Sequence, residues 1–380
     1  MKLFTASALI ALAACSASTP AVSQRAPFTV TTVADFDAPW AMTFLPDGRM
    51  LVTEKQGQLK LVSADAKAVT VVSGTPTVDY AGQGALMDVV LHPDFGQNRI
   101  VYLSWSEAGE GGKGVALGRG KLVEKQVQCI RAPCPPVAEL QGFETIFRAR
   151  PFVTGNGHYS GRIVFSPDKQ FLFFANGERQ KFDPAQDKSM TLGKLLRLTP
   201  DGKPAPGNPL VKDGFQPEVW SYGHRNILGL AFDAAGNLWE QEMGPKGGDE
   251  VNLILPGRNY GYPLVSDGDH YDGKLIPRHS TRPDLEAPKV SWNPVISPGG
   301  LIIYSGKMFP QWKGDAFIGG LSSEALVRVD INGTTASKGD QWPMGARIRE
   351  VEEGPDGAIW LLEDGGRGSQ GRLLKLTPAK

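Results

Sequence analysis

One pattern of apolar and polar positions recurs along the chain: a short apolar run, a turn of the Pro-Asp-Gly kind, and a second short apolar run. The clearest copies are "AMTFLPDGRMLVTE", "GRIVFSPDKQFLFFAN" and "VEEGPDGAIWLLED". Looser copies are "ALMDVVLHPDFGQNRIVYLSW", "LGLAFDAAGNLWEQE" and "GLIIYSGKMFPQWKGDAFIGG". An Asp-Gly turn between β-rich runs is a strong hairpin signal, and no long stretch shows helical periodicity. The pattern therefore predicts six β-hairpins.

Further strand-like pieces lie between these hairpins, among them "GQLKLVS", "KLLRLTP", "ALVRVDI" and "GRLLKLTP". Six hairpins with outer strands predict an all-β fold, a six-bladed β-propeller with four-stranded blades and long inter-strand insertions. A β-sandwich, the alternative, would not need six near-equivalent turns. We expect the N-terminal strand "FTVTTVA" to pair with the final blade and close the ring, which removes exposed sheet edges.

The first residues do not belong to this repeat. The segment "MKLFTASALIALAAC" combines a basic Lys2, an apolar stretch and small residues before Cys15. This is the pattern of a secretory signal, and it is too short to span a membrane. The sequence therefore divides into a signal peptide (1–14), a flexible tether (15–27) and a single propeller domain (28–380).

The residues that end this signal, "LAAC", resemble a bacterial lipobox, which implies that Cys15 becomes the lipid-modified first residue of the mature protein. Ordinary cleavage nearby, with Cys15 discarded, is the alternative. Ser16 follows, and no Asp retention signal is present. The sequence therefore favours an exported lipoprotein on the periplasmic side of a Gram-negative outer membrane, with membrane contact only through the lipid on Cys15.

The charge balance narrows the range of partners. The 380 residues include 40 basic and 40 acidic side chains, so the formal charge is zero. This argues against a nucleic-acid surface, which needs clustered Lys and Arg. Export also bears on Cys129 and Cys134, because an oxidising compartment favours a local disulfide between them. A metal site at these thiols is the weaker alternative, since no His lies nearby to complete the coordination.

The segment "SYGHRNILGLAFD" places three polar residues directly before an apolar strand. In a propeller the innermost strand of each blade begins near one face of the central channel, so the residues before equivalent strands should converge. The positions found in this way are Trp40, Gln83, His158, Arg225 with Asn226, the segment 297–299, and Arg347 with Arg349. Arg347 and Arg349 are two residues apart on a predicted strand and should point to the same side.

These converging side chains predict a site for a polyanion. Arginine stays charged and binds carboxylates bidentately. His158 could titrate near neutral pH and act as a base. Taken singly, an arginine at a strand start is more often part of an ion pair, and a single histidine is more often structural. The convergence at equivalent repeat positions is what favours a shared polar funnel.

From Pro39 to the C-terminus the chain resembles the soluble glucose and aldose sugar dehydrogenases that depend on pyrroloquinoline quinone (PQQ). The segments that carry the resemblance include "PWAMTFLPDGRMLVTEKQGQLKLV", "GQGALMDVVLHPDF", "GHYSGRIVFSPD", "GHRNILGLAFD", "GPKGGDEVNLILPGRNYGYP" and "RIREVEEGPDGAIWLLED". Single pieces are common to many propellers, but all six in this order are specific. The resemblance implies a six-bladed propeller that oxidises the anomeric carbon of aldoses to lactones with PQQ and Ca²⁺.

The resemblance also implies a role for each matched position. His158 matches the family's catalytic base. Gln83 matches a residue near the substrate and is grouped with the cofactor-binding positions. Arg225 and Asn226 match residues at the cofactor, with Arg225 placed to steady charge on the quinone oxygen. The remaining matches are Arg347 and Arg349, which would hold the PQQ carboxylates, and Gly244 and Pro245, whose carbonyls would bind the calcium.

The sequence departs from the family pattern at three positions. Ser322 replaces a Lys that usually contacts the cofactor, Glu178 stands where an Asp is expected, and Met243 stands where related sequences often carry a polar residue. His270 and His279 lie in a loop over the channel and are expected to face solvent. The motifs do not specify which aldose is the substrate or what accepts its electrons.

Two other functions compete with the dehydrogenase. A calcium-dependent propeller lactonase or esterase would coordinate its metal with Glu, Asn and Asp side chains, whereas the predicted inner positions are rich in arginine. A non-catalytic propeller that binds saccharide or protein is the third hypothesis, and the Ser322 departure is the feature that favours it.

Overall fold

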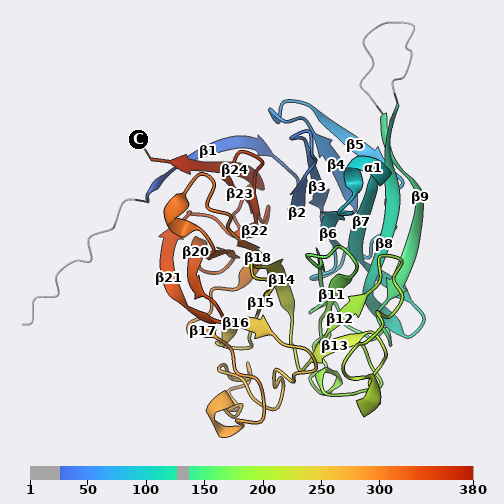
Figure 1. Ribbon diagram of the computed structural model, residues 1–380, viewed down its shortest axis with the longest axis vertical. Coiled ribbons are helices and arrows are strands. Elements are labelled where there is room, and N and C mark those ends of the chain that lie inside the picture. The colour runs from blue at the N-terminus through green and yellow to red at the C-terminus, as the bar shows by residue number, and fades with distance from the viewer. Residues whose placement is uncertain (1–25, 126–136, 380) are drawn as a thin grey trace, which may run out of the picture.

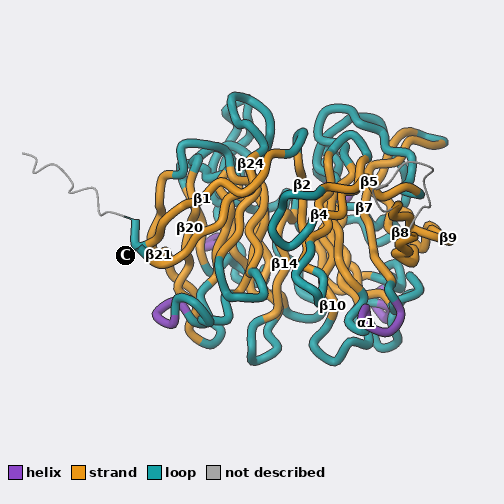
Figure 2. The backbone as a smooth tube through the Cα atoms, turned by 90° about the horizontal axis from the view of Figure 1, so that it is seen from above, coloured by secondary structure: helices purple, strands orange, loops and turns teal. Residues whose placement is uncertain are grey.

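The computed structural model describes residues 26–125 and 137–379. The predicted signal peptide, Cys15, and the pair Cys129 and Cys134 lie outside these ranges. Within the described residues the chain forms 24 strands and only short helices. Figure 2 shows the strands lying between two layers of loops. The expected absence of long helices is confirmed in this part of the chain.

Successive strands along the chain group into blades. The first blade has β2 (Pro39–Phe44), β3 (Met50–Glu54), β4 (Gln58–Val62) and β5 (Val69–Ser73). The second has β6 (Leu86–Leu91), β7 (Ile100–Gly109), β8 (Gly112–Lys125) and β9 (Val137–Arg148). The third has β10 (Ser160–Phe165), β11 (Leu172–Asn176), β12 (Lys194–Leu198) and β13 (Val219–Tyr222). The fourth has β14 (Ile227–Phe232), β15 (Leu238–Glu242), β16 (Asp249–Ile254) and β17 (Val290–Trp292).

The fifth blade has β18 (Pro298–Ile303), β19 (Ala316–Gly320), β20 (Ala325–Asn332) and β21 (Thr335–Pro343). The last has β22 (Ile348–Glu353), β23 (Ile359–Glu363), β24 (Arg372–Pro378) and the N-terminal β1 (Phe28–Asp35). The helical pieces are α1 (Phe95–Asn98), η1 (Asp183–Ala185), η2 (Val211–Asp213), η3 (His279–Thr281) and η4 (Pro310–Trp312). None of these described helices has the length and apolar character needed to cross a membrane.

The inner strands close into a ring, which confirms the predicted propeller. Strands β2, β6, β10, β14, β18 and β22 each contact the next, and β22 contacts β2 (Figure 1). The sheets are antiparallel within each blade. The outer strands β5 and β9 also pair in parallel through Val72 with Ala138 and Ser73 with Glu139, which joins the first two blades into one eight-stranded sheet.

The N-terminal strand completes the last blade, as predicted. β1 pairs antiparallel with β24, from Phe28 opposite Pro378 to Asp35 opposite Arg372. Phe28 also packs edge-on against Trp342 of the fifth blade, with ring centroids 5.4 Å apart. The closure therefore combines backbone pairing with aromatic packing, and it leaves β24 without an open edge.

The six hairpin turns have the same backbone feature. Each contains a residue with positive φ shortly before the second strand of its blade, and these are Gly48, Arg99, Lys169, Gly236, Gly314 and Gly357. Glycine adopts this conformation without steric cost, which is why four of the six positions are glycine. In the other two turns Arg99 and Lys169 adopt the same conformation, with φ of +60° and +64°.

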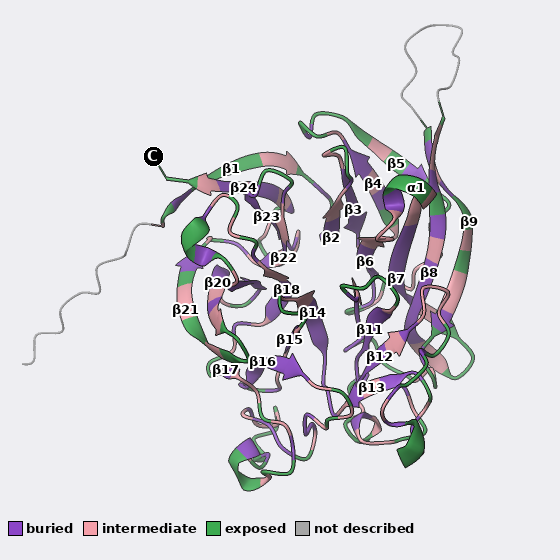
Figure 3. Cartoon of the chain, viewed as in Figure 1, coloured by how far each residue is buried: buried purple, intermediate pink, exposed green. Residues whose placement is uncertain are grey.

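The second strand of most blades is buried along its whole length. Every residue of β3, β11, β15, β19 and β23 is buried, because each strand lies inside its own sheet with neighbouring blades against both faces (Figure 3). Four of these strands are mainly apolar, as such a position requires. The exception is β15, "LWEQE", which buries Glu240, Gln241 and Glu242.

Candidate functional site

Two cavities meet on the face of the propeller where the inner strands begin. One, of about 380 Å³, is lined by Trp40, Lys55, Asn226, Ser322, Arg347, Arg349 and Asp364, among others. The other, of about 540 Å³, is lined by His158, Arg225, Gly244, Pro245 and residues of the 269–273 loop. Gln83, Met243 and Ser297 line both cavities. We call the two together the axial funnel.

The axial funnel contains the site residues that the sequence singled out. The structure brings together Gln83, His158, Arg225, Asn226, Gly244, Pro245, Arg347 and Arg349, although they come from several different blades. Trp40 and Ser297 line the same space. The cavity volumes are typical of small-molecule sites, which occupy about 300–1,000 Å³. The arrangement can therefore enclose a ligand of cofactor size.

His158 is held in an unusual backbone conformation at the base of the funnel. Its φ is +49°, in the left-handed region that a non-glycine residue rarely adopts. The His158 amide donates to Gln83 Oε1 at 2.6 Å, which fixes this conformation. A Cβ on the adjacent Gly177 would lie 2.1 Å from the His158 carbonyl oxygen, so only glycine fits there. Local strain of this kind is concentrated at functional sites.

The imidazole of His158 is paired with a buried carboxylate. Its Nδ1 contacts Glu178 Oε1, and Glu178 Oε2 accepts a hydrogen bond from the Phe182 amide at 2.7 Å. Burial alone would raise the pKa of Glu178, but His158 and this amide outweigh it, and the pKa lies below its ordinary value. An ionised carboxylate can only accept, so His158 Nδ1 carries the hydrogen and Nε2 keeps its lone pair.

The protonation balance of His158 suits a base. Burial lowers its pKa below the ordinary value, Glu178 opposes this effect, and the nearby charge of Arg225 adds to the lowering. The imidazole is therefore neutral at neutral pH, with a free Nε2. A neutral imidazole with one ring nitrogen fixed by a carboxylate can accept a proton from a bound hydroxyl group.

A single carboxylate gathers three cations at the other side of the funnel. Asp364 accepts from Lys55 Nζ at 2.7 Å, from Arg347 Nε at 3.0 Å and from Arg349 Nε at 2.8 Å. Arg347 and Arg349 thus do point to the same side. Burial acts to raise the pKa of Asp364, but Arg349 and Lys55 hold it far below the usual range. One negative charge for three positive charges leaves an excess that an anionic ligand would neutralise.

The excess positive charge also changes the pKa of Lys55. Burial, together with the positive charges of Arg349 and Arg347, lowers the pKa of Lys55 to about 8 despite the contact with Asp364.

Sequence reasoning missed Lys55 and Asp364. Both follow the second strand of their blades, β3 and β23, and Glu178 lies just beyond the end of β11. Because second strands end on the face where inner strands begin, the residues after them also reach the funnel.

Arg225 and Asn226 are fixed by their backbones. Both amides donate to Glu242 Oε2, at 2.5 and 2.9 Å. Arg225 Nη1 donates to the Met243 carbonyl at 2.9 Å, so this position contributes its backbone, and the buried Nε of Arg225 has no hydrogen-bond partner among the described residues. The guanidinium thus retains an unused donor, which a ligand oxygen in the funnel could satisfy.

The loop of Gly244 and Pro245 borders a small space next to two buried glutamates. A cavity of about 10 Å³ is bounded by Gly244, Pro245, Glu242, Glu250 and other residues. Asp249 braces the loop, since it accepts from the Gly244 amide at 2.9 Å and from the Ser297 amide at 2.7 Å. Carbonyl and carboxylate oxygens are the ligands that Ca²⁺ prefers. The sequence had not placed Glu242 in this site.

Three further positions differ from expectation or extend it. His279 does not face solvent: it is buried, with Nε2 3.2 Å from the Tyr260 carbonyl oxygen. Its Nδ1 lies 3.7 Å from Asp267 Oδ1, so polar groups surround the buried ring. His270 lines the funnel beside Tyr271. Ser322 also lines it, with its hydroxyl 3.4 Å from the Val295 carbonyl oxygen.

The chain is similar to known proteins over almost its whole length. Residues 36–375 match the family described as glucose/sorbosone dehydrogenase. Aldose sugar dehydrogenase YliI of Escherichia coli is 39% identical over 350 residues, which cover 90% of each chain.

Solved structures give the same result. The soluble aldose sugar dehydrogenase from Escherichia coli in the apo-form has a TM-score of 0.83 at 37% identity, covering 93% of this chain and 100% of that chain. The PQQ-bound form of aldose sugar dehydrogenase from Streptomyces coelicolor has a TM-score of 0.73 at 30% identity, covering 92% and 98%.

Proposed function

Because the chain belongs to the glucose/sorbosone dehydrogenase family, we propose that it oxidises the anomeric carbon of aldose sugars to lactones with PQQ and calcium. The observation that carries the proposal is the axial funnel, in which His158, paired with Glu178, lines one cavity and the excess positive charge of Lys55, Arg347 and Arg349 lines the adjoining one. A base and a polyanion site in one enclosure are what this reaction requires.

The residues of the funnel fit PQQ, a quinone with three carboxylates. Arg347, Arg349 and Lys55 would hold its carboxylates, and Arg225 and Asn226 would contact its ring oxygens. The unpartnered Arg225 Nε supports this assignment. Ser322 stands where the family usually has a lysine. Lys55, which follows β3 in the first blade, would supply a positive charge in its place. When bound, PQQ supplies the acceptor for the hydride that leaves the sugar.

Calcium would be held by the Gly244 and Pro245 carbonyls, with the nearby carboxylates of Glu242 and Glu250 adding negative charge. Its chemistry there is that of a Lewis acid that polarises a quinone oxygen. This choice of metal rests on the donor set, which consists of hard oxygens.

The protein's own contribution to the reaction is placement and proton transfer. His158 Nε2 would accept the proton of the anomeric hydroxyl, and Glu178 would stabilise the imidazolium that forms. Gln83 fixes the His158 backbone and lines both cavities, so it would also orient the sugar. His270 and Tyr271 line the cavity of about 540 Å³, where they would contact the distal part of the sugar.

The full chain should be loaded with PQQ and Ca²⁺, and reduction of an artificial electron acceptor should be followed with a panel of aldoses. We expect turnover that needs both additions. Lactone hydrolysis with metal alone would instead support the lactonase hypothesis. Cofactor loading without turnover of any aldose would support a binding propeller and contradict the proposal.

Lys55 provides a test that does not need turnover. A bound polyanion should raise the pKa of Lys55 above about 8 and draw in roughly half a proton per PQQ at pH 8. Calorimetric titration of PQQ in two buffers of different ionisation enthalpy measures this uptake. Lys55→Met should abolish it and weaken binding. Lys246→Met should retain it, because Lys246 lines the cavity of about 540 Å³ and not the one that contains Asp364. Equal uptake in Lys55→Met and the parent would exclude Lys55 from the cofactor site.

We also propose export to the periplasmic side with a lipid on Cys15. Incorporation of labelled palmitate in the parent but not in Cys15→Ala, with release of that variant into the soluble periplasmic fraction, tests this assignment. A parent protein that takes up no label would contradict it.

A further inference from the structure

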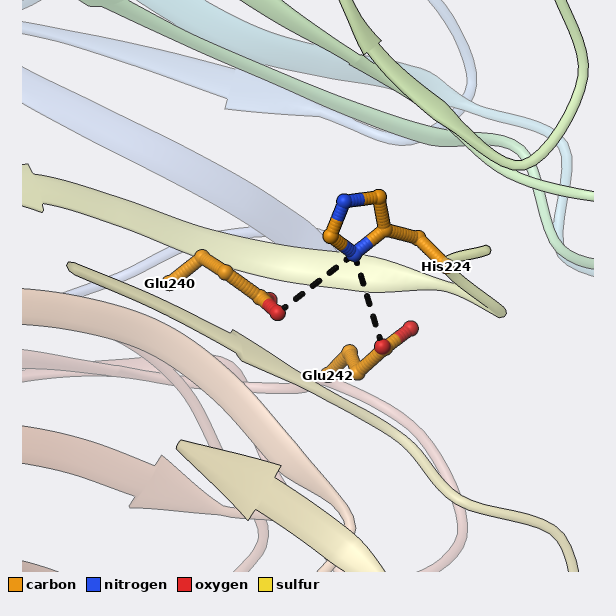
Figure 4. Close-up of side chains that lie close together, drawn as sticks. All are labelled: His224, Glu240 and Glu242. Atoms are coloured by element: carbon orange, nitrogen blue, oxygen red, sulfur yellow. Dashed lines mark ion pairs between the residues drawn. The ribbon is translucent and has the colours of Figure 1, made fainter. Parts of the chain in front are cut away.

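A second cluster of chemistry-bearing side chains lies behind the axial funnel, inside the fourth blade. It consists of His224, just before β14, and of Glu240 and Glu242, both on β15 (Figure 4). Glu240 and Glu242 are two residues apart on the strand and point to the same side, where the imidazole faces them. All three residues are buried, with 0%, 0% and 3% of their surface exposed. We call this group the β15 cluster.

The β15 cluster is poorly explained by hydrogen bonding. His224 Nδ1 lies 3.6 Å from Glu240 Oε1 and 3.6 Å from Glu242 Oε1, which is too long for a hydrogen bond to either. His224 Nδ1 and Glu240 Oε2 have no hydrogen-bond partner among the described residues. A proton on Nδ1 would therefore have no acceptor at bonding distance. Buried polar atoms left in this state need an explanation, and a bound ion is one that would satisfy both atoms here.

The spacing is that of ligands around one metal ion. The three ligand atoms lie within 4.8 Å of one another. Two ligand atoms, each about 2.0–2.2 Å from a central ion at a tetrahedral angle, lie roughly 3.4 Å apart. The 3.6 Å separations from His224 Nδ1 agree with this value without any movement of the backbone. An ion would also neutralise two carboxylates that the fold otherwise buries side by side.

The surroundings supply the supporting contacts of a metal site. His224 Nε2 lies 2.8 Å from Ser221 Oγ, which can hold the ring with Nδ1 free for an ion. Tyr260 stacks on the imidazole, with ring centroids 4.7 Å apart. Asn252 Nδ2 donates to Glu240 Oε1 at 2.8 Å. Both the imidazole and the Glu240 carboxylate are thus oriented from outside the cluster.

From this geometry we propose that His224, Glu240 and Glu242 form a buried site for a divalent transition-metal ion of the Zn²⁺ class. One imidazole nitrogen with two carboxylate oxygens suits such an ion, whereas Ca²⁺ takes oxygen ligands. A fourth ligand, such as a water molecule, would complete a tetrahedral coordination. Glu242 lies between this site and the calcium proposed at Gly244 and Pro245, but His224 and Glu240 do not border that calcium. The proposal does not depend on the proposed reaction.

The ion would act on the funnel through Glu242. This carboxylate binds the proposed ion through Oε1, and its Oε2 accepts from the amides of Arg225 and Asn226. Fixing Glu242 therefore fixes the backbone that presents Arg225 to the funnel. His224 and Glu240 are positioning residues in this sense, and neither touches the space where a substrate would lie.

The test is to unfold the full chain in chelator, refold it with or without Zn²⁺, remove free ion, and measure zinc per chain. We expect one zinc per chain in the parent and its loss in His224→Gln and Glu240→Gln. The matched control is Glu218→Gln, which changes another fully buried glutamate, one that pairs with Arg150 in the third blade. The cysteines are present in every variant, so zinc bound to thiols does not alter the difference.

A second measurement avoids variants that fail to fold. The parent chain refolded with Co²⁺ should show visible absorption bands of a low-coordinate nitrogen and oxygen site, and added Zn²⁺ should abolish them. The proposal is overturned if the parent holds no zinc beyond that of His224→Gln, if Glu240→Gln keeps the full complement, or if Co²⁺ gives only the spectrum of the hydrated ion. Those results would assign the β15 cluster to a protonated His224 between two glutamates.

Discussion

Replacement of His158 by alanine is expected to lower kcat/KM for aldose oxidation by roughly 10²–10⁴-fold, the usual contribution of general-base catalysis. The imidazole is buried and neutral, and Glu178 fixes its Nδ1, so the substitution removes the proton acceptor at Nε2. The cofactor would be held mainly by Lys55, Arg347 and Arg349, so PQQ affinity should change little. Dye reduction for turnover and PQQ titration for binding measure the two effects separately.

Glu178→Gln tests the residue that pairs with His158. The carboxylate raises the pKa of His158 against the effect of burial, so its removal should lower that pKa further. The acid limb of the kcat/KM profile should then move to lower pH, with a loss of roughly 10²-fold from the weaker base and the less stabilised imidazolium. A merely structural role would leave the pH profile in place. Full activity in His158→Ala would remove His158 from the mechanism.

The sequence predicted the fold because the repeat is local. Each hairpin turn is marked by residues such as Pro, Asp and Gly, and six copies are compatible with few all-β folds. The same reading, taken backward from each inner strand, found His158, Arg225 and Arg347. It could not find Lys55 or Asp364, because they follow second strands, which run in the opposite direction to the same face. Reading forward from each second strand would have identified both.

The polar triplet before β14 shows what sequence alone could not resolve. His224, Arg225 and Asn226 are consecutive, yet their side chains lie in different parts of the structure. Arg225 faces the funnel, and Asn226 Oδ1 accepts from the Ser160 amide at 3.1 Å. His224 turns back toward β15. The clue to its role was in the sequence "LWEQE", where two glutamates occupy a strand that the propeller buries on both faces.

The opposite end of the channel has a polar centre of its own, which ties the blades together. A cavity of about 460 Å³ there is lined by residues from all six inner strands. Arg162 on β10 lies at its base, where its Nε donates to the Leu228 carbonyl at 2.6 Å. Its Nη1 contacts Glu350 Oε2 at 2.5 Å and Asp88 Oδ1 at 3.3 Å. The guanidinium also lies 4.2 Å from the ring centroid of Trp40.

Arg162→Met is therefore expected to destabilise the fold by about 3–5 kcal/mol, the range seen when one partner of a buried ion pair is removed. One guanidinium joins the third blade to the first, second, fourth and last blades. Methionine keeps much of the packing but leaves Asp88 and Glu350 buried without a cation. Chemical denaturation of the parent and the variant at several pH values measures the effect.

The pH dependence separates the lost charge from lost packing. Burial raises the pKa of Glu350 to about 7 and that of Asp88 above its ordinary value, although Arg162 opposes both shifts. Without Arg162 both pKa values rise further, so the folded variant holds protons that the unfolded chain releases. Its stability deficit should therefore grow as the pH rises through 7 and shrink near pH 5, where the carboxyls are protonated. Adding Glu350→Gln should recover part of the loss at pH 8. A deficit that is equal at pH 5 and pH 8 would mean that packing, and not the charge of Arg162, holds the inner strands together.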